Sequence, residues 1–164
     1  MPSSLILTVL TVIVVLALIP GLLGRRKSKP KKGAIMTADT PQACLDRIRD
    51  AWDAGDAATY ARQFTADATY VIFLGDAILG CAEIERTHVD VFGRWQKGTR
   101  MAIDIVQLTE LSPDVVVVLT AGGISKTEPI VRDKFQTYTL LRIDGTWLCA
   151  AFQNTEMSER SKPA

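Results

Sequence analysis

An uninterrupted apolar run near the N-terminus constrains the fold of this chain more than any other feature. The run, Leu5–Leu23 (LILTVLTVIVVLALIPGLL), contains no charged side chain among its 19 residues. As a helix rising about 1.5 Å per residue it would span roughly 28 Å, which matches the hydrocarbon layer of a bilayer. A buried core helix would need a polar face to turn toward water, and this run has none. We therefore expect residues 1–24 to form a transmembrane helix.

The residues around the apolar run favour an uncleaved anchor over a cleaved signal peptide. No basic residue precedes the run, and the sequence that follows it, RRKSKPKK, has no small-residue cleavage site. Six basic residues and no acid occupy positions 25–32, so the positive-inside rule places the C-terminal side in the cytoplasm. We expect residues 25–37 to be a basic juxtamembrane linker that contacts anionic headgroups, with a nucleic-acid-binding arm as the competing interpretation. The chain is thus expected to be a single-pass membrane protein with a cytoplasmic domain.

The charge of the remaining chain argues against a nucleic-acid partner. Beyond the linker the chain holds all 18 acidic residues but only 13 of the 19 basic ones, a net charge of −5. Such a domain has no general electrostatic attraction to a polyanion.

The three cysteines of the chain are far apart and odd in number, which argues against a disulfide framework and against a cysteine-based zinc site. No cluster of histidine, aspartate and glutamate in the sequence is typical of a metal site either.

Capping and turn signals place helices before strands in the rest of the chain. Thr40-Pro41 and Gly55 mark the start and the end of a first helix, and Asp56 begins a shorter second helix. A third helix is expected over residues 82–95. Strands are expected at residues 68–74, 77–79, 100–111, 115–121, 130–143 and 146–155.

This order of elements predicts an α+β domain. We expect residues 38–156 to form a curved antiparallel sheet that packs on about three helices. The polar segment that follows, residues 157–164, is expected to be a disordered tail.

Two sequence blocks, Ala51–Phe92 and Asp144–Thr155, resemble the nuclear transport factor 2-like superfamily, and within it the SnoaL-like proteins and the SgcJ/EcaC family. The matching elements are, in chain order, Gly55-Asp56, Phe64, Asp67-Ala68, Gly80, Ile84, His88, Asp144-Gly145, Trp147 and residues 151–155. The resemblance implies a cone-shaped half-barrel with a pocket between the concave face of the sheet and the helices. One departure is Gln153, which stands where relatives often carry histidine, and this argues against a base at that point.

The resemblance also implies two functions. The family includes isomerases, dehydratases, cyclases and hydrolases, together with non-enzymatic binding and dimerisation modules. The first hypothesis is a membrane-anchored domain that binds a small, largely apolar molecule and acts on it by acid/base chemistry without a cofactor. No GxGxxG fingerprint for a nicotinamide or flavin occurs in the sequence. The alternative is a non-catalytic ligand-binding or dimerisation module, and in both cases we expect a homodimer formed through the sheet.

His88, the only histidine, is the first candidate for a catalytic residue. Helical spacing places it on the inward face of its helix with Phe92 and Trp95, where it is either an acid/base group or a satisfied core residue. Asp76 is the second catalytic candidate, although a simple turn is the alternative interpretation. The expected ligand-binding residues are large rings and amides: Trp52, Tyr60, Tyr70, Phe92, Gln136, Tyr138, Gln153 and Asn154.

The last two strands allow a prediction of which side chains share a face. Asp144-Gly145 is typical of a two-residue hairpin turn, and regular pairing from that turn places Gln136 opposite Gln153. Alternation then puts this pair on the same face as Tyr138 and leaves Asn154 on the other. On a concave face the two glutamines would orient a ligand, whereas on the opposite face they would be solvated or lie at a dimer interface. The sequence does not decide between the two faces.

Overall fold

The computed structural model describes residues 38–161, which belong to a single compact unit. The expected transmembrane helix (1–24) and basic linker (25–37) lie outside the described residues. Within residues 38–161, no helix has the length and apolar character needed to cross a membrane.

The first helix begins and ends where the sequence predicts, and the second begins as predicted but ends at Ala61, so that Phe64, expected on this helix, instead begins strand β1 (Phe64–Val71). Helix α1 (Pro41–Ala54) is capped by the hydroxyl of Thr40, and it ends at Gly55, whose φ of 65° is the left-handed conformation that glycine adopts without strain. Helix α2 (Ala57–Ala61) is short and is capped by the carboxylate of Asp56. Both caps satisfy backbone N–H groups that a helix leaves unpaired at its first turn.

The third helix departs from the expected regular geometry at its C-terminal end. Helix α3 (Cys81–Asp90) continues into a π-helical turn, η1 (Val91–Trp95), in which the N–H of Gln96 donates to the carbonyl of Val91 at 2.7 Å. A π-turn spaces its hydrogen bonds five residues apart, so it rotates every later side chain around the helix axis. Trp95 is consequently 65% exposed, and the prediction that it lies on the inward face is wrong.

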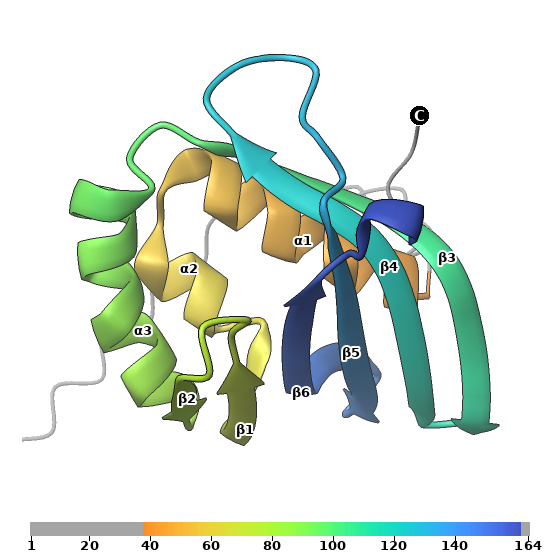
Figure 1. Cartoon of the computed structure of the whole chain (residues 1–164). Coiled ribbons are helices and arrows are strands. Elements are labelled where there is room, and N and C mark those ends of the chain that lie inside the picture. The colour runs from red at the N-terminus through yellow and green to blue at the C-terminus, as the bar shows by residue number, and fades with distance from the viewer. Residues whose placement is uncertain (1–37, 162–164) are drawn as a thin grey trace, which may run out of the picture. The chain divides into compact units, whose positions relative to one another are not determined.

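Six strands form one curved sheet in the order β2-β1-β6-β5-β4-β3. Their bounds are β1 Phe64–Val71, β2 Ala77–Leu79, β3 Arg100–Ser112, β4 Val115–Ser125, β5 Lys134–Ile143 and β6 Thr146–Glu156. Neighbouring strands are antiparallel as predicted, except that β1 and β6 run parallel. The sheet curves around the three helices (Figure 1), which confirms the expected α+β architecture. We call the face toward the helices the inner face and the opposite one the outer face.

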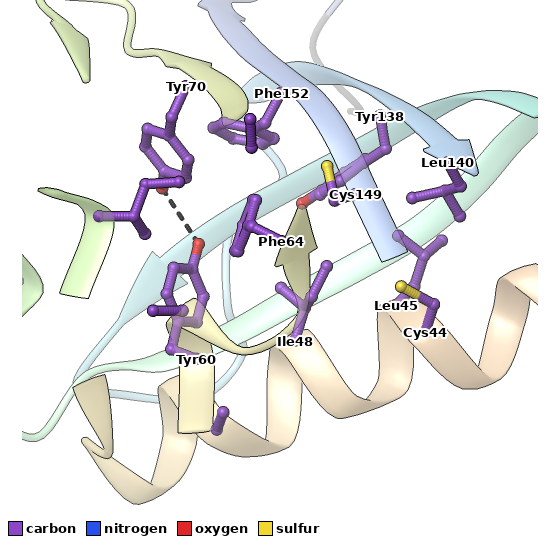
Figure 2. Packing of buried hydrophobic residues seen from close by; sticks show 14 of the residues in the cluster. Cys44, Leu45, Ile48, Tyr60, Phe64, Tyr70, Tyr138, Leu140, Cys149 and Phe152 are labelled. Atoms are coloured by element: carbon purple, nitrogen blue, oxygen red, sulfur yellow. Dashed lines mark hydrogen bonds between the residues drawn. The ribbon is translucent and has the colours of Figure 1, made fainter. Parts of the chain in front are cut away.

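The hydrophobic core fills the space between the helices and the inner face. Helix α1 contributes the fully buried Cys44, Leu45 and Ile48. Figure 2 shows these side chains packed against residues of β1, β5 and β6, namely Phe64, Tyr138, Leu140, Cys149 and Phe152. Burial of this apolar surface is the main favourable contribution to the stability of the domain.

A cluster that we call the Asp39 clamp ties the start of the domain to the sheet. The carboxylate of Asp39 accepts two hydrogen bonds from Arg47, at 2.7 and 3.2 Å, and one from the N–H of Trp147, at 2.7 Å. Arg47 also donates to the carbonyl of Trp147 at 2.9 Å. Burial by itself would raise the pKa of Asp39, but the hydrogen bonds from Arg47 and Trp147 hold this pKa below its usual value.

The segment after β6 is more ordered than the expected disordered tail. Met157 is only 6% exposed, and its N–H donates to the carbonyl of Asp133 at 2.8 Å. A 3₁₀ turn, η2 (Glu159–Ser161), follows it. An apolar side chain and a backbone hydrogen bond therefore hold the start of this segment against the sheet, and residues 162–164 of the expected tail lie outside the described residues.

Candidate functional site

Aromatic rings centred on His88 occupy the interior of the domain. The rings of Trp52 from α1, Tyr60 from α2, Tyr70 from β1 and Phe92 from η1 have centroids 6.1, 4.5, 5.3 and 5.4 Å from the imidazole. Each of these five residues is at most 9% exposed. The structure thus brings one catalytic candidate and four expected ligand-binding residues into a single buried group, which we call the aromatic cluster.

His88 is held as a neutral imidazole in this cluster. It is 2% exposed, and its Nδ1 lies 2.8 Å from the carbonyl oxygen of Ile84, one turn earlier in α3. Because a carbonyl only accepts hydrogen bonds, Nδ1 must carry the proton. Burial lowers the pKa of His88 to about 4, although the Ile84 carbonyl acts in the opposite direction. An acid/base catalyst works best with a pKa near the working pH, and this imidazole lies far below neutrality.

The other ionisable groups of the interior are uncharged as well. The hydroxyls of Tyr60 and Tyr70 share a hydrogen bond of 3.1 Å (Figure 2). Burial raises the pKa of both tyrosines and of Tyr138. It also raises the pKa of the Cys44 thiol to about 12 and raises that of Cys149. At neutral pH none of these groups is ionised, so none of them is poised to exchange a proton.

Asp76, the second catalytic candidate, lies apart from the aromatic cluster. It is exposed in the turn between β1 and β2, where its backbone carbonyl accepts from the N–H of Ile72 at 3.0 Å. Gly75 precedes it with a φ of 91°, a conformation that suits a tight turn. The structure therefore gives Asp76 the role of a turn residue.

The described residues include no evident metal centre. Within residues 38–161, no three histidine, cysteine, aspartate or glutamate side chains are placed to hold an ion together. The three cysteines are free thiols, and Cys81 donates from its Sγ to the carbonyl of Ala61 at 3.1 Å. Their contacts are those of packing residues.

A β-bulge interrupts the C-terminal hairpin. Asp144-Gly145 forms the predicted two-residue turn, with positive φ at both positions. Pairing from the turn is regular as far as Leu140 and Cys149, but Ala150 has no partner and the ladder resumes at Ala151. One extra residue in β6 therefore shifts the register of every pair beyond this point.

The bulge decides which predicted ligand-binding residues face inward. Gln136 lies opposite Asn154, and Gln153 lies opposite Thr137, so the prediction that Gln136 faces Gln153 is wrong by one residue. Gln136 is 4% exposed on the inner face beside Tyr138, which is 1% exposed. Gln153 is exposed on the outer face. A shift of one residue moves a side chain to the other face of a sheet. Here it places Asn154, and not Gln153, opposite Gln136 on the inner face.

Three polar residues meet on the inner face, and we call them the polar trio: Thr120, Gln136 and Asn154. They are direct neighbours across β4, β5 and β6. The hydroxyl of Thr120 donates to Oε1 of Gln136 at 3.0 Å, and Oδ1 of Asn154 accepts from the N–H of Phe73 at 2.7 Å. Thr120 was missing from the predicted site, although its alternation with Val118 in β4 would have placed it inward.

Three polar atoms of the interior have no hydrogen-bond partner among residues 38–161. They are Nε2 of Gln136, Nε2 of His88 and the hydroxyl of Tyr138. No fully buried side-chain nitrogen or oxygen of the described residues lacks a partner, so each of these atoms must reach space that a water molecule can enter. Their residues are only 4, 2 and 1% exposed, so each atom meets this space over a small area. Atoms of this kind, in an apolar interior, are available to orient a bound molecule.

A separate pocket of about 400 Å³ lies on the outer face. It is lined by Asp104, Val106, Ala121, Arg132, Phe135, Met157 and Ser161. The Nε of Arg132 donates to Asp104 at 2.6 Å, so the two charges in its lining are already paired. His88 and the other expected site residues do not line this pocket.

Comparisons with known proteins identify the fold. No protein-family model and no curated protein matches the chain. A cystatin-like domain of unknown function from Nostoc punctiforme aligns with a TM-score of 0.64 at 22% identity, over 71% of this chain and 74% of that one. An NTF-2 like protein of unknown function from Shewanella oneidensis aligns with a TM-score of 0.60 at 15% identity, over 69% and 93% of the two chains.

The domain has a nuclear transport factor 2-like fold. A ketosteroid isomerase-like protein from Erwinia carotovora atroseptica shares it, with a TM-score of 0.55 at 18% identity over 71% of this chain and 93% of that one. The nuclear transport factor 2-like cone accounts for the curved sheet wrapped around three helices. Identities this low establish the fold, and the function must be argued from the side chains.

Proposed function

We propose that this domain is a non-catalytic module that binds a small, neutral, largely apolar molecule inside the cone. The observation that carries the proposal is the chemistry of the interior. Aromatic rings line it, the free polar atoms of Gln136, Tyr138 and His88 are not fully buried, and the buried histidine, tyrosines and cysteines of the described residues are uncharged at neutral pH. An apolar site with a few polar atoms is the usual character of a small-molecule site. The likeness to a ketosteroid isomerase-like protein supports a ligand of this class.

Acid/base catalysis of the SnoaL-like or SgcJ/EcaC type is less well supported. It would require His88 to exchange a proton near neutral pH, yet burial holds its pKa at about 4. Asp76, the other catalytic candidate, lies in an exposed turn and adds no second titrating group to the aromatic cluster. The available Nε2 of His88 suits a neutral hydrogen bond to a ligand better than proton transfer.

The proposed module is tethered to the membrane, with the domain in the cytoplasm. The support is the uncharged run Leu5–Leu23 and the six basic residues that follow it. A reporter fused after Ala164 is expected to behave as cytoplasmic. Activity of an alkaline phosphatase fused at that position would place the domain outside and refute this orientation.

We also propose that the module forms a homodimer through the outer face of its sheet. Apolar side chains at the centre of this face stay partly exposed: Val117, Leu119, Leu141 and Leu148. Covering them with the same face of a second copy would remove this surface from water, as in other two-fold dimers.

Two glutamines on opposite faces of one hairpin provide a matched test of ligand binding. The test uses isotope-labelled protein and a set of neutral aromatic ketones such as acetophenone, which combine an apolar ring with one hydrogen-bond acceptor. We expect a bound ketone to shift the side-chain amide signals of Gln136 and to leave those of Gln153 unchanged. Gln136→Leu is expected to weaken binding, whereas Gln153→Leu is expected to preserve it. Equal effects of the two substitutions, or shifts confined to the outer face, would refute binding inside the cone.

A further inference from the structure

We infer that exposed Trp95 and the cations beside it form a contact site for an anionic membrane surface. This inference rests on the proposed tether and adds a second, independent contact between the domain and the lipid. The chain has three tryptophans; Trp52 and Trp147 are 7% and 5% exposed, whereas Trp95 is 65% exposed. An indole at a membrane interface buries its apolar body and keeps its N–H in the polar headgroup layer.

The structure presents Trp95 on a rigid turn. The π-helical turn η1 directs it outward, and the bond from the Gln96 N–H to the Val91 carbonyl closes that turn. Two further bonds hold the segment that follows: the N–H of Thr99 donates to the carbonyl of Gln96 at 3.0 Å, and Nε1 of Trp52 donates to the hydroxyl of Thr99 at 3.0 Å. Because the backbone is already ordered, docking of the indole carries little additional cost in conformational entropy.

Local charge singles out Trp95 among the exposed apolar side chains. Residues 91–100 contain three cations and no acid. The other large groups of exposed apolar residues lie on acidic segments: residues 73–85 contain three acids and no cation, and residues 105–114 contain two acids and no cation. A negatively charged lipid surface attracts the first segment and repels the other two.

The cations near Trp95 are available to a competing anion. Lys97 makes no ion pair with any residue between 38 and 161. Arg94 lies 3.7 Å from Asp90, with an exposed guanidinium group. The guanidinium of Arg100 is also exposed and lies 3.4 Å from Asp53 and 3.5 Å from Glu128. Exposed pairs of this length contribute little, so lipid phosphates can replace the carboxylates at small cost.

The linker is long enough that it does not fix which face of the domain contacts the bilayer. Residues 24–37 separate the apolar run from the first described residue, and fully extended they reach up to roughly 50 Å. A linker of this reach allows any face of a small domain to meet the bilayer. The face with an exposed indole, the unpaired Lys97 and two weakly paired arginines is then the one that lipid favours.

Quenching of tryptophan fluorescence by brominated lipid tests the inference on the full chain. The protein is placed in nanodiscs that contain phosphatidylserine, with either brominated or ordinary acyl chains. We expect brominated lipid to remove the emission of Trp95, and Trp95→Phe to abolish this quenched component. The double variant Arg94→Gln/Lys97→Gln is expected to weaken the contact by about fivefold for each cation removed. The charge-matched control Arg62→Gln/Arg160→Gln is expected to quench like the unchanged protein.

The outcomes separate this inference from the tether on which it rests. Protein that co-elutes with the nanodiscs but shows equal emission in brominated and ordinary discs keeps the tether and refutes the Trp95 contact. Protein that does not co-elute with the nanodiscs refutes both. Quenching that is the same in phosphatidylcholine and phosphatidylserine discs, or unaffected by Arg94→Gln/Lys97→Gln, would overturn the electrostatic part. Protection of Trp95 from acrylamide without lipid would assign this surface to a protein contact instead.

Discussion

Mild acid should destabilise the folded domain through His88. The unfolded chain binds a proton on this histidine near its ordinary pKa of 6.5, whereas the folded domain binds it only near pH 4. Between these values the unfolded state holds more protons, so the free energy of unfolding must fall as the pH falls. His88 is the only histidine of the chain, so no other histidine contributes to the loss of stability in the upper part of this pH range.

The two pKa values set the size of the effect. A shift of one pKa unit corresponds to about 1.4 kcal/mol, so the full penalty below both values is about 3 kcal/mol. Between about pH 7 and about pH 5, where carboxylates titrate little, the expected loss is about 2 kcal/mol. A marginally stable domain would show this as a clear shift of its unfolding midpoint.

Urea unfolding of residues 38–164, followed by fluorescence across this pH range, measures the effect. The control is His88→Asn, whose amide nitrogen can still donate to the carbonyl of Ile84 but cannot take up a proton in this range. We expect the variant to lose the slope with pH while keeping a cooperative transition. An unchanged midpoint in the original protein, or an equal slope in His88→Asn, would contradict the burial of a neutral imidazole.

Three further substitutions test other parts of the structure. Asp39→Asn should lower the free energy of unfolding in urea by about 1–2 kcal/mol at neutral pH. Because the pKa of Asp39 is lowered in the folded domain, this difference should vanish as acid protonates the folded carboxylate. A difference that persists in acid would contradict the clamp. A Cβ at Gly122 would lie 2.6 Å from the carbonyl oxygen of Ala102, so Gly122→Ala should lower the free energy of unfolding by about 1–3 kcal/mol. The control is Gly93→Ala, whose Cβ would meet nothing within 4 Å and which should be nearly neutral in the same assay. Leu119→Arg should convert the proposed dimer to monomer in sedimentation at unchanged helix content, and a dimer that persists would exclude the outer face.

Local signals predicted the elements well because they act within a few residues. Thr40 and Gly55 bound α1 through contacts inside a single turn, and Asp144-Gly145 forms its turn from backbone conformation alone. The π-turn before Trp95 and the bulge at Ala150 were missed. Both depend on how distant surfaces fit together, and no residue in either segment signals them locally.

The candidate site was predictable in its apolar part and much less so in its polar part. Helical phase placed His88 and Phe92 inward, and the structure agrees. The pKa of His88 was not predictable, since it reflects burial by rings from three other elements. For the same reason the polar trio was predicted only in part. Gln136 and Asn154 were among the expected ligand-binding residues and Thr120 was not, and the pairing of Gln136 with Asn154 depends on the bulge.

The Asp39 clamp also defines where mechanical load would enter the domain. Any tension along the chain from its N-terminal side arrives at Asp39, immediately before α1. There the hydrogen bonds from Arg47 and Trp147 divide this tension between α1 and β6. Strand β6 is an interior strand that lies between β1 and β5. The helix cannot be peeled off turn by turn until these charge-assisted bonds break together. A domain pulled from its N-terminal side would thus resist from the middle of its sheet, where a strand shares force with two neighbours.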